Sequence, residues 1–233
     1  MTTRLGIGLA SIGLGVLLTA CGGDSFTDLS GEEMADASKD AMKGLDAVKV
    51  SGTIKNDGNE VSLDIQTNDK GECTGSVGIG GGKAEILGAD GSIWFKPDEA
   101  FWRTSASSAA DQIIGVVGDK WVVAPNGGDG FDEFCDIDKL LDQMLSTGKD
   151  DSSTYEKGDA KKIDGVEAVP ISHEGDNGSS IGYVRVDDPH YLVKIEKTDG
   201  EDGGAVTFSE FNEKVDVEAP APDDVIDLDN LAG

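Results

Sequence analysis

The sequence predicts an α+β domain: a strongly curved antiparallel sheet of about ten strands, a half-barrel, that wraps against a few α-helices. Three observations predict this class. Runs of alternating apolar and polar residues recur along the chain, short turn clusters separate them, and two helical segments interrupt them near the middle. A sheet this wide curls, so its concave side and the helices are expected to enclose a volume. Whether side chains or a ligand fill that volume is the functional question.

The first expected elements are a helix and a hairpin. Ser30 and Glu33 form a capping-box pattern ahead of apolar residues at helical spacing. Those residues are Met34, Ala37, Ala41, Leu45 and Val48. The period then changes to 2, and the alternating runs 48–54 and 61–65 flank a turn at 56–59, which predicts an antiparallel hairpin.

The rest of the chain repeats this alternation. Further strands are expected at 73–79, 83–87, 92–96, 154–160, 166–172, 181–186, 191–197 and 205–211. Between the third and fourth of these, residues 106–117 and 131–145 each present one apolar face and predict two helices. The segment 219–228 is expected to be extended and to close on a short apolar anchor.

The N-terminal segment has the features of an export signal. Arg4 supplies one positive charge, and an apolar run from Leu5 to Leu17 follows it. The tetrapeptide 18–21 (Leu-Thr-Ala-Cys) resembles the bacterial lipobox, which implies a diacylglyceryl thioether on Cys21 and cleavage before it. The alternative is an uncleaved anchor, but the run is shorter than the roughly 20 apolar residues that a spanning helix needs.

This reading divides the chain into three parts. Residues 1–20 are expected to be a signal peptide, 21–29 a flexible tether and 30–233 a single domain. The expected location is the extracytoplasmic face of the cell membrane, where the lipid on Cys21 supplies the membrane affinity. The protein is expected to be a monomer.

Charge excludes one class of partner. The whole chain has 46 acidic and 19 basic residues, and removal of the signal takes away Arg4 alone, which leaves a net charge of −28. Such a field repels nucleic acid, so no nucleic-acid function is expected.

The two remaining cysteines are expected to pair. Exported proteins favour disulfides, and lipidation of Cys21 leaves Cys73 and Cys135 as the natural partners. The bridge would tie a strand to a helical segment. Two separate buried thiols are the alternative.

The sequence contains no catalytic or metal-binding signature, so neither an enzyme activity nor a metal or other cofactor is expected. His173 and His190 form no ligand cluster and are expected at the surface, at strand ends. The acids Asp129, Asp132, Glu133, Asp136 and Asp138 miss the spacing of an EF-hand loop. Their place at a helix start favours the helix dipole instead.

Several short motifs, in order and spacing, resemble those of one family. They are the lipobox, the strand containing Gly52, Gly71–Gly75, Ser92–Lys96 with Trp102, Tyr183–Asp187 with Pro189, and Phe208–Phe211 leading to Ala219-Pro220. The chain thereby resembles the actinobacterial LppX/LprA/LprF/LprG lipoprotein family over essentially its whole mature length. The resemblance implies a LolA/LolB-like fold whose apolar cavity receives the acyl chains of lipids or glycolipids.

Candidate cavity-lining residues come from the expected strands and helices. They are Leu63, Ile65, Val77, Ile79 and Ile86 on the sheet, and Ile113, Val117, Leu141 and Met144 on the helical side. A plain packed core would give the same pattern. Two functions therefore stay open: a lipid-anchored protein that binds or carries lipids or glycolipids, and an envelope lipoprotein that senses or binds a partner protein without lipid cargo.

Overall fold

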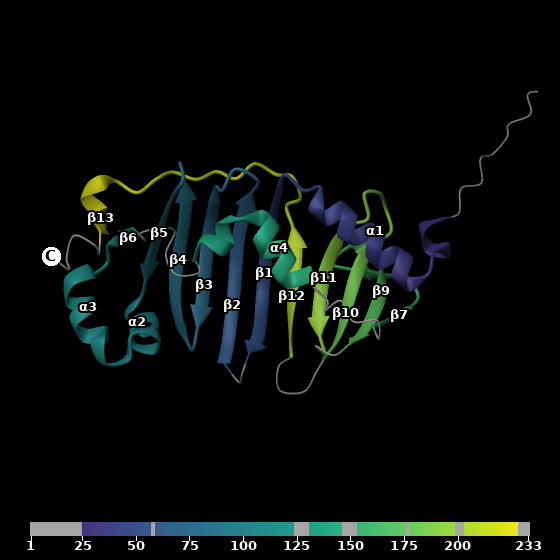
Figure 1. The fold of residues 1–233 in the computed structure, drawn as a ribbon, viewed down its shortest axis with the longest axis horizontal. Helices are drawn as coiled ribbons and strands as arrows, with labels where there is room; N and C mark the ends of the chain where they lie inside the picture. Colours follow the sequence, from purple (N-terminus) through teal and green to yellow (C-terminus); the bar gives the residue numbers. More distant parts are fainter. Residues whose placement is uncertain are drawn as a thin grey trace, which may run out of the picture.

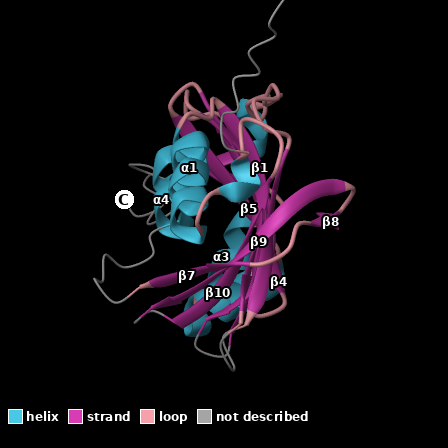
Figure 2. Ribbon diagram, turned by 90° about the vertical axis from the view of Figure 1, so that its right-hand side faces the viewer, coloured by secondary structure: helices cyan, strands magenta, loops and turns pink. Residues whose placement is uncertain are grey.

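A computed structural model describes residues 25–56, 59–123, 131–145, 153–175, 178–198 and 203–227. These residues form one large, open, curved sheet with helices over its concave side (Figures 1 and 2). The predicted α+β class is confirmed. The expected signal peptide and Cys21 lie outside the described residues.

Over the described residues, the sheet has thirteen strands rather than about ten. They are β1 (Ala47–Asn56), β2 (Asn59–Asn68), β3 (Cys73–Ile79), β4 (Gly82–Ala89), β5 (Ser92–Pro97), β6 (Trp121–Val123), β7 (Thr154–Lys157), β8 (Lys161–Ile163), β9 (Val166–Gly175), β10 (Gly178–Arg185), β11 (Leu192–Lys197), β12 (Gly204–Ser209) and β13 (Val225–Asp227). The three additional strands, β6, β8 and β13, have three residues each, which is too short for alternation to reveal.

Strand order follows from the hairpins. The path is β13-β6-β5-β4-β3-β2-β1-β12-β11-β10-β9-β7, and β8 pairs with β9 beside this path. The pairing is antiparallel except between β13 and β6, which are parallel. The C-terminal segment crosses the ends of the intervening strands, from β12 to β13 beside β6, along the top of the view in Figure 1. The end of the predicted extended segment, residues 225–227, is thus held to the sheet as the short strand β13.

The helices are α1 (Gly31–Lys43), α2 (Glu99–Ser105), α3 (Ala110–Val117) and α4 (Ile137–Leu145), with short 3₁₀ turns η1 (Phe26–Asp28), η2 (Ser107–Ala109), η4 (Phe131–Cys135) and η6 (Pro222–Asp224). The predicted helix 106–117 begins later, at Ala110, and α2 was not predicted. Asp98 caps α2, since its Oδ1 accepts a hydrogen bond from the Phe101 amide at 2.7 Å. The predicted helix 131–145 starts as a 3₁₀ turn.

The capping box at the start of α1 is confirmed. The Ser30 Oγ accepts from the Glu33 amide at 3.2 Å, and the Ser30 amide donates to the Glu33 carboxylate at 2.8 Å. The Ser30 amide and hydroxyl both donate to the Glu33 carboxylate, and these two hydrogen bonds lower the pKa of Glu33. Met34 and Met42 are fully buried against the sheet, so α1 is fixed both at its end and along its apolar face.

Packing differs along the sheet. At the β3–β6 end, the sheet packs against α2 and α3. The apolar cluster there contains Phe95 and Val122 from the strands and Trp102 and Val117 from the helices. At the other end, α1 and α4 cover β1, β2 and β9–β12 and bury the largest apolar cluster (Figure 1). That second end contains the hollows described next.

Candidate functional site

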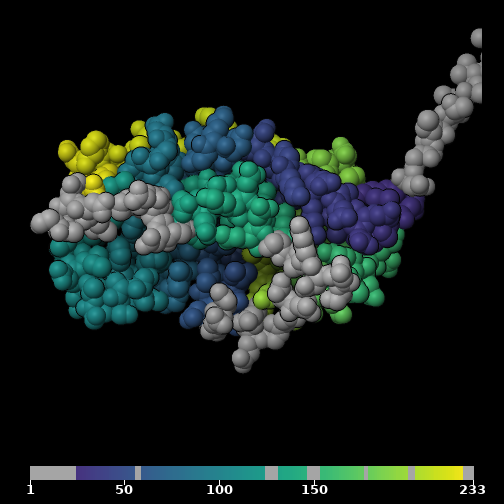
Figure 3. All heavy atoms as spheres, in the orientation of Figure 1, coloured from purple at the N-terminus to yellow at the C-terminus, as the bar shows by residue number. Residues whose placement is uncertain are grey.

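Two adjoining hollows lie between the concave face of the sheet and the helices α1 and α4. The larger is about 480 Å³ and is partly open to solvent. It is lined by Ile54, Val61, Leu63, Phe134, Leu140, Gln143, Met144, His173, Gly178, Ser179, Ser180, Ile195, Lys197, Gly204 and Val206. Figure 3 views the molecule from the side on which α1 and α4 cover the sheet. The lining is mainly apolar, as binding of an apolar group requires.

The smaller hollow, about 100 Å³, lies under α1. It is lined by Ala35, Ser38, Lys39, Met42, Met144, Leu145, Tyr155, Ile171, His173, Ser180, Gly182, Val184, Leu192 and Ile195. Four residues, Met144, His173, Ser180 and Ile195, line both hollows. The two spaces therefore adjoin one another beneath the helix pair.

The cause of the hollow is visible on β10. Its consecutive inward positions are Gly178, Ser180 and Gly182, all of which line one or both hollows. Between Ser180 and Gly182, the larger Ile181 side chain packs on the opposite face of the sheet. Because successive side chains of a strand point to opposite faces, β10 places little volume beneath the helices. This period-2 run of small residues is the sequence signal for the site, and the predicted lining residues did not include it.

The nine predicted lining residues divide between the hollow and the core. Leu63 and Met144 line the larger hollow, and Met144 also lines the smaller one. Ile65, Val77 and Ile86 are buried in a cluster around the disulfide, with Ile79 packed against it. Val117 is buried in the cluster that α2 and α3 form with the sheet, and Ile113 packs against that cluster. Leu141, on α4, is buried in the large core cluster between the helices and the sheet. The neighbour Leu140 lines the hollow instead.

His173 corrects a sequence expectation. It was expected at the surface, but it is 8% exposed and forms part of the wall of both hollows. Tyr155 of the flanking strand β7 packs on it, with ring centres 5.0 Å apart. Burial, and secondarily the charge of Lys39, lower the pKa of His173, so its neutral form is favoured. His190 is half-buried and stacks on Phe26 at 3.8 Å.

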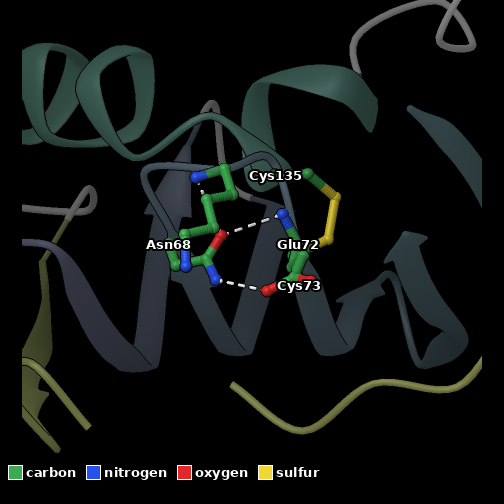
Figure 4. Close-up of a disulfide and its surroundings, with 5 residues drawn as sticks. Asn68, Glu72, Cys73 and Cys135 are labelled. Atoms are coloured by element: carbon green, nitrogen blue, oxygen red, sulfur yellow. Dashed lines mark hydrogen bonds between the residues drawn. A yellow bond between two sulfur atoms is a disulfide. The ribbon is translucent and has the colours of Figure 1, made fainter. Parts of the chain in front are cut away.

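The predicted disulfide between Cys73 and Cys135 is present and joins β3 to η4 (Figure 4). Gly88 makes room for it, because a Cβ there would lie 2.8 Å from the Cys135 sulfur and 3.0 Å from that of Cys73. Beside it, Asn68 closes the β2–β3 turn by accepting a hydrogen bond from the Glu72 amide at 3.0 Å. The disulfide thereby links this part of the sheet covalently to η4.

The acidic cluster has a structural account within the described residues. Lys139 lies 3.3 Å from the Asp132 carboxylate and 3.4 Å from that of Asp136, and Gln143 donates to Glu133. Asp129 lies outside the described residues. In the part of the chain that the structure describes, no three His, Cys, Asp or Glu side chains are placed to hold a metal ion. Nor does any described helix have the length and apolar character to span a membrane.

Comparison with solved structures identifies the fold. LprF from Mycobacterium bovis is similar over 82% of this chain and 97% of its own, with 15% sequence identity and a TM-score of 0.55. The chain has the fold of LprF. The Mycobacterium tuberculosis lipoprotein LppX is 19% identical, covering 80% of this chain and 97% of its own, at a TM-score of 0.49. A LolA superfamily protein from Nitrosomonas europaea is 7% identical, covers 84% and 96%, and gives 0.24.

Scans of family models and of curated proteins find no match. The resemblance read from the sequence is confirmed at the level of fold by LprF, whose likeness spans most of both chains. At this identity the likeness concerns architecture.

Proposed function

We propose that this protein is a lipid-anchored extracytoplasmic lipoprotein that binds the acyl chains of a lipid or glycolipid in the hollows beneath α1 and α4. One observation carries the proposal: an open space of about 480 Å³ with a mainly apolar lining. Ligand-binding pockets run from about 300 to 1,000 Å³ with such linings. In this proposal the protein acts as a monomer, without a chemical step and without a cofactor.

The N-terminus supports the same role. The lipobox-like sequence ending at Cys21 would place the domain on a short tether beside a bilayer, at the extracytoplasmic face. Tethering raises the effective concentration of bilayer lipid near the opening of the hollow. The signal peptide over 1–20, the tether over 21–29 and the domain over 30–233 are parts of this proposal.

The energetics favour a carrier over a tight receptor. An acyl chain that moves from a bilayer into an apolar hollow exchanges one apolar surrounding for another, so the net free energy of transfer is small. Loading should then be reversible and tolerant of chain length. Tight binding of one lipid with no exchange into vesicles would contradict a carrier role.

The alternative is an envelope lipoprotein that binds a partner protein and carries no lipid. That reading needs a filled interior and an exposed apolar patch. The interior beneath α1 and α4 is hollow, and among the described residues Val116 is the large apolar side chain that stands exposed. The lipid-binding proposal therefore has the stronger structural support.

Transfer from vesicles tests the proposal. The protein is secreted as a soluble Cys21→Ser version and mixed with vesicles that contain pyrene-labelled phosphatidylcholine, whose excimer emission falls when the lipid leaves the bilayer. We expect transfer that saturates at about one lipid per protein. Ser180→Leu fills the wall shared by both hollows and should abolish transfer, whereas Ser172→Leu, on the exposed face of β9, should not. Absence of transfer by the folded parent would contradict the proposal.

A further inference from the structure

A row of polar residues crosses the concave face where the two hollows adjoin. Tyr155 of β7 lies opposite His173 of β9, His173 lies opposite Ser180 of β10, and Ser180 lies opposite Lys197 of β11. Each of the four side chains lines one or both hollows. The strand register thus places four polar groups side by side along one line of the wall.

The neighbouring inward row is apolar. Ile171 lies opposite Gly182, Gly182 opposite Ile195, and Ile195 opposite Val206. The two rows are two residues apart along each strand, which corresponds to about 7 Å. The wall therefore changes from apolar to polar over a short distance, as an amphiphile does where its chain meets its headgroup.

The charged residues that line the two hollows are basic. The chain has 46 acidic and 19 basic residues, yet the described residues that line the two hollows include no Asp or Glu. Their charged members are Lys39 and Lys197. The charge of Lys39 reaches His173, since it adds to the effect of burial in lowering the pKa of that imidazole. Two lysines and no carboxylate among the described lining residues favour an anion in these hollows.

Two buried polar atoms of the wall lack a partner within the described part of the chain. They are the Oγ of Ser38, a residue 3% exposed, and the Nε2 of His173, a residue 8% exposed. Buried polar groups are ordinarily hydrogen-bonded, so each such atom needs an explanation. Lys39 lies beside them, with its Nζ 3.3 Å from the Tyr155 hydroxyl.

We propose that the row Tyr155–His173–Ser180–Lys197, together with Ser38 and Lys39 of α1, binds the anionic headgroup of an acyl lipid. The headgroup would be a carboxylate or a phosphate, and the chain would occupy the apolar part of the larger hollow. Oxygens of either group accept hydrogen bonds from a serine hydroxyl, an imidazole N–H and lysine ammonium groups. The inference rests on the proposed function, because it assigns the polar end of the same hollows.

Displacement of a neutral probe separates the two claims. N-phenyl-1-naphthylamine reports occupancy of the apolar hollow in the Cys21→Ser protein. Decanol, decanoate and decyl phosphate, which share one chain length, are then added as competitors. We expect decanoate, decyl phosphate or both to displace the probe at a concentration about tenfold lower than decanol does. Simple partitioning predicts the opposite order, because an ionised group resists transfer from water.

Matched variants locate the effect. Lys197→Gln should lower the preference for the better anion over decanol about fivefold, whereas Lys162→Gln on β8 removes the same charge elsewhere and should leave that preference unchanged. Ser38→Ala should likewise weaken the anion, with Thr67→Val as its control. Thr67 also has a buried hydroxyl with no partner among the described residues, but it lines neither hollow.

The outcomes are distinct. Preference for decanoate alone assigns a carboxylate, and preference for decyl phosphate alone a phosphate. Decanol as effective as both anions, or equal effects of Lys197→Gln and Lys162→Gln, would overturn the headgroup site while leaving the apolar hollow intact. A probe that neither binds nor is displaced would instead count against the proposed function.

Discussion

The two ends of one continuous sheet are built differently. At the β3–β6 end, the Cys73–Cys135 disulfide, Ile86 and the aromatic residues Phe95 and Phe131 fill the space between sheet and helices, with the two rings 5.0 Å apart. At the β9–β12 end, α1 and α4 cover a space that the side chains of the described residues leave open. Cover by helices therefore does not by itself determine packing.

The difference comes from the size of a few inward side chains. The first end places large side chains and a cross-link inward, whereas β10 places glycine and serine there. The helices α1 and α4 stay in position because Met34, Met42 and Leu141 anchor them in the core beside the hollow. A cavity survives where small residues adjoin a well-anchored cover.

The largest expected effect is loss of the cross-link. Cys73→Ala with Cys135→Ala frees a loop of 62 residues in the unfolded chain, which should lower the free energy of unfolding by about 4 kcal/mol. Denaturant unfolding of the soluble protein measures this change. A loss below about 1 kcal/mol would show that the disulfide does not stabilise the packed end. The probe-binding hollow should survive wherever the variant remains folded.

A matched pair of isoleucines tests the contrast in packing. Ile86→Ala, in the cluster around the disulfide, should cost about 3 to 4 kcal/mol, because Ile86 is fully buried among side chains. Ile195→Ala, in the wall of both hollows, should cost less than half as much, since Ile195 has fewer contacts to lose on its hollow side. Equal losses of unfolding free energy would mean that the two ends are packed alike.

The smallest expected effect is a pH dependence at the hollow end. The pKa of His173 is lower in the folded protein than its ordinary value of 6.5, so the unfolded chain binds more protons between the two values. Stability should then be complete above about pH 6.5 and fall as the pH drops through this window. His173→Gln should remove that component, so its stability relative to the parent should rise on acidification. A constant difference across the window would contradict this assignment.

The sequence was sufficient for the main elements and insufficient for the hollow. Alternation located ten strands, the Ser30–Glu33 pattern located α1, and compartment reasoning paired the cysteines. Strands of three residues carry too few positions for a period, and α2 has only seven residues, about two turns, which is too short for a helical period to stand out. Cavity residues were harder, because a large apolar residue marks packed core as readily as a ligand wall. The small residues of β10 were the informative ones.

The most direct test of the central claim is mass spectrometry of organic extracts from the secreted Cys21→Ser protein, purified without detergent. We expect about one acyl lipid per protein molecule, and its near absence from Ser180→Leu protein purified in the same way. Ser172→Leu protein should retain the lipid. Extracts without lipid from folded parent protein, or equal lipid content in the Ser180→Leu variant, would contradict the account that the hollow beneath α1 and α4 holds the acyl chains.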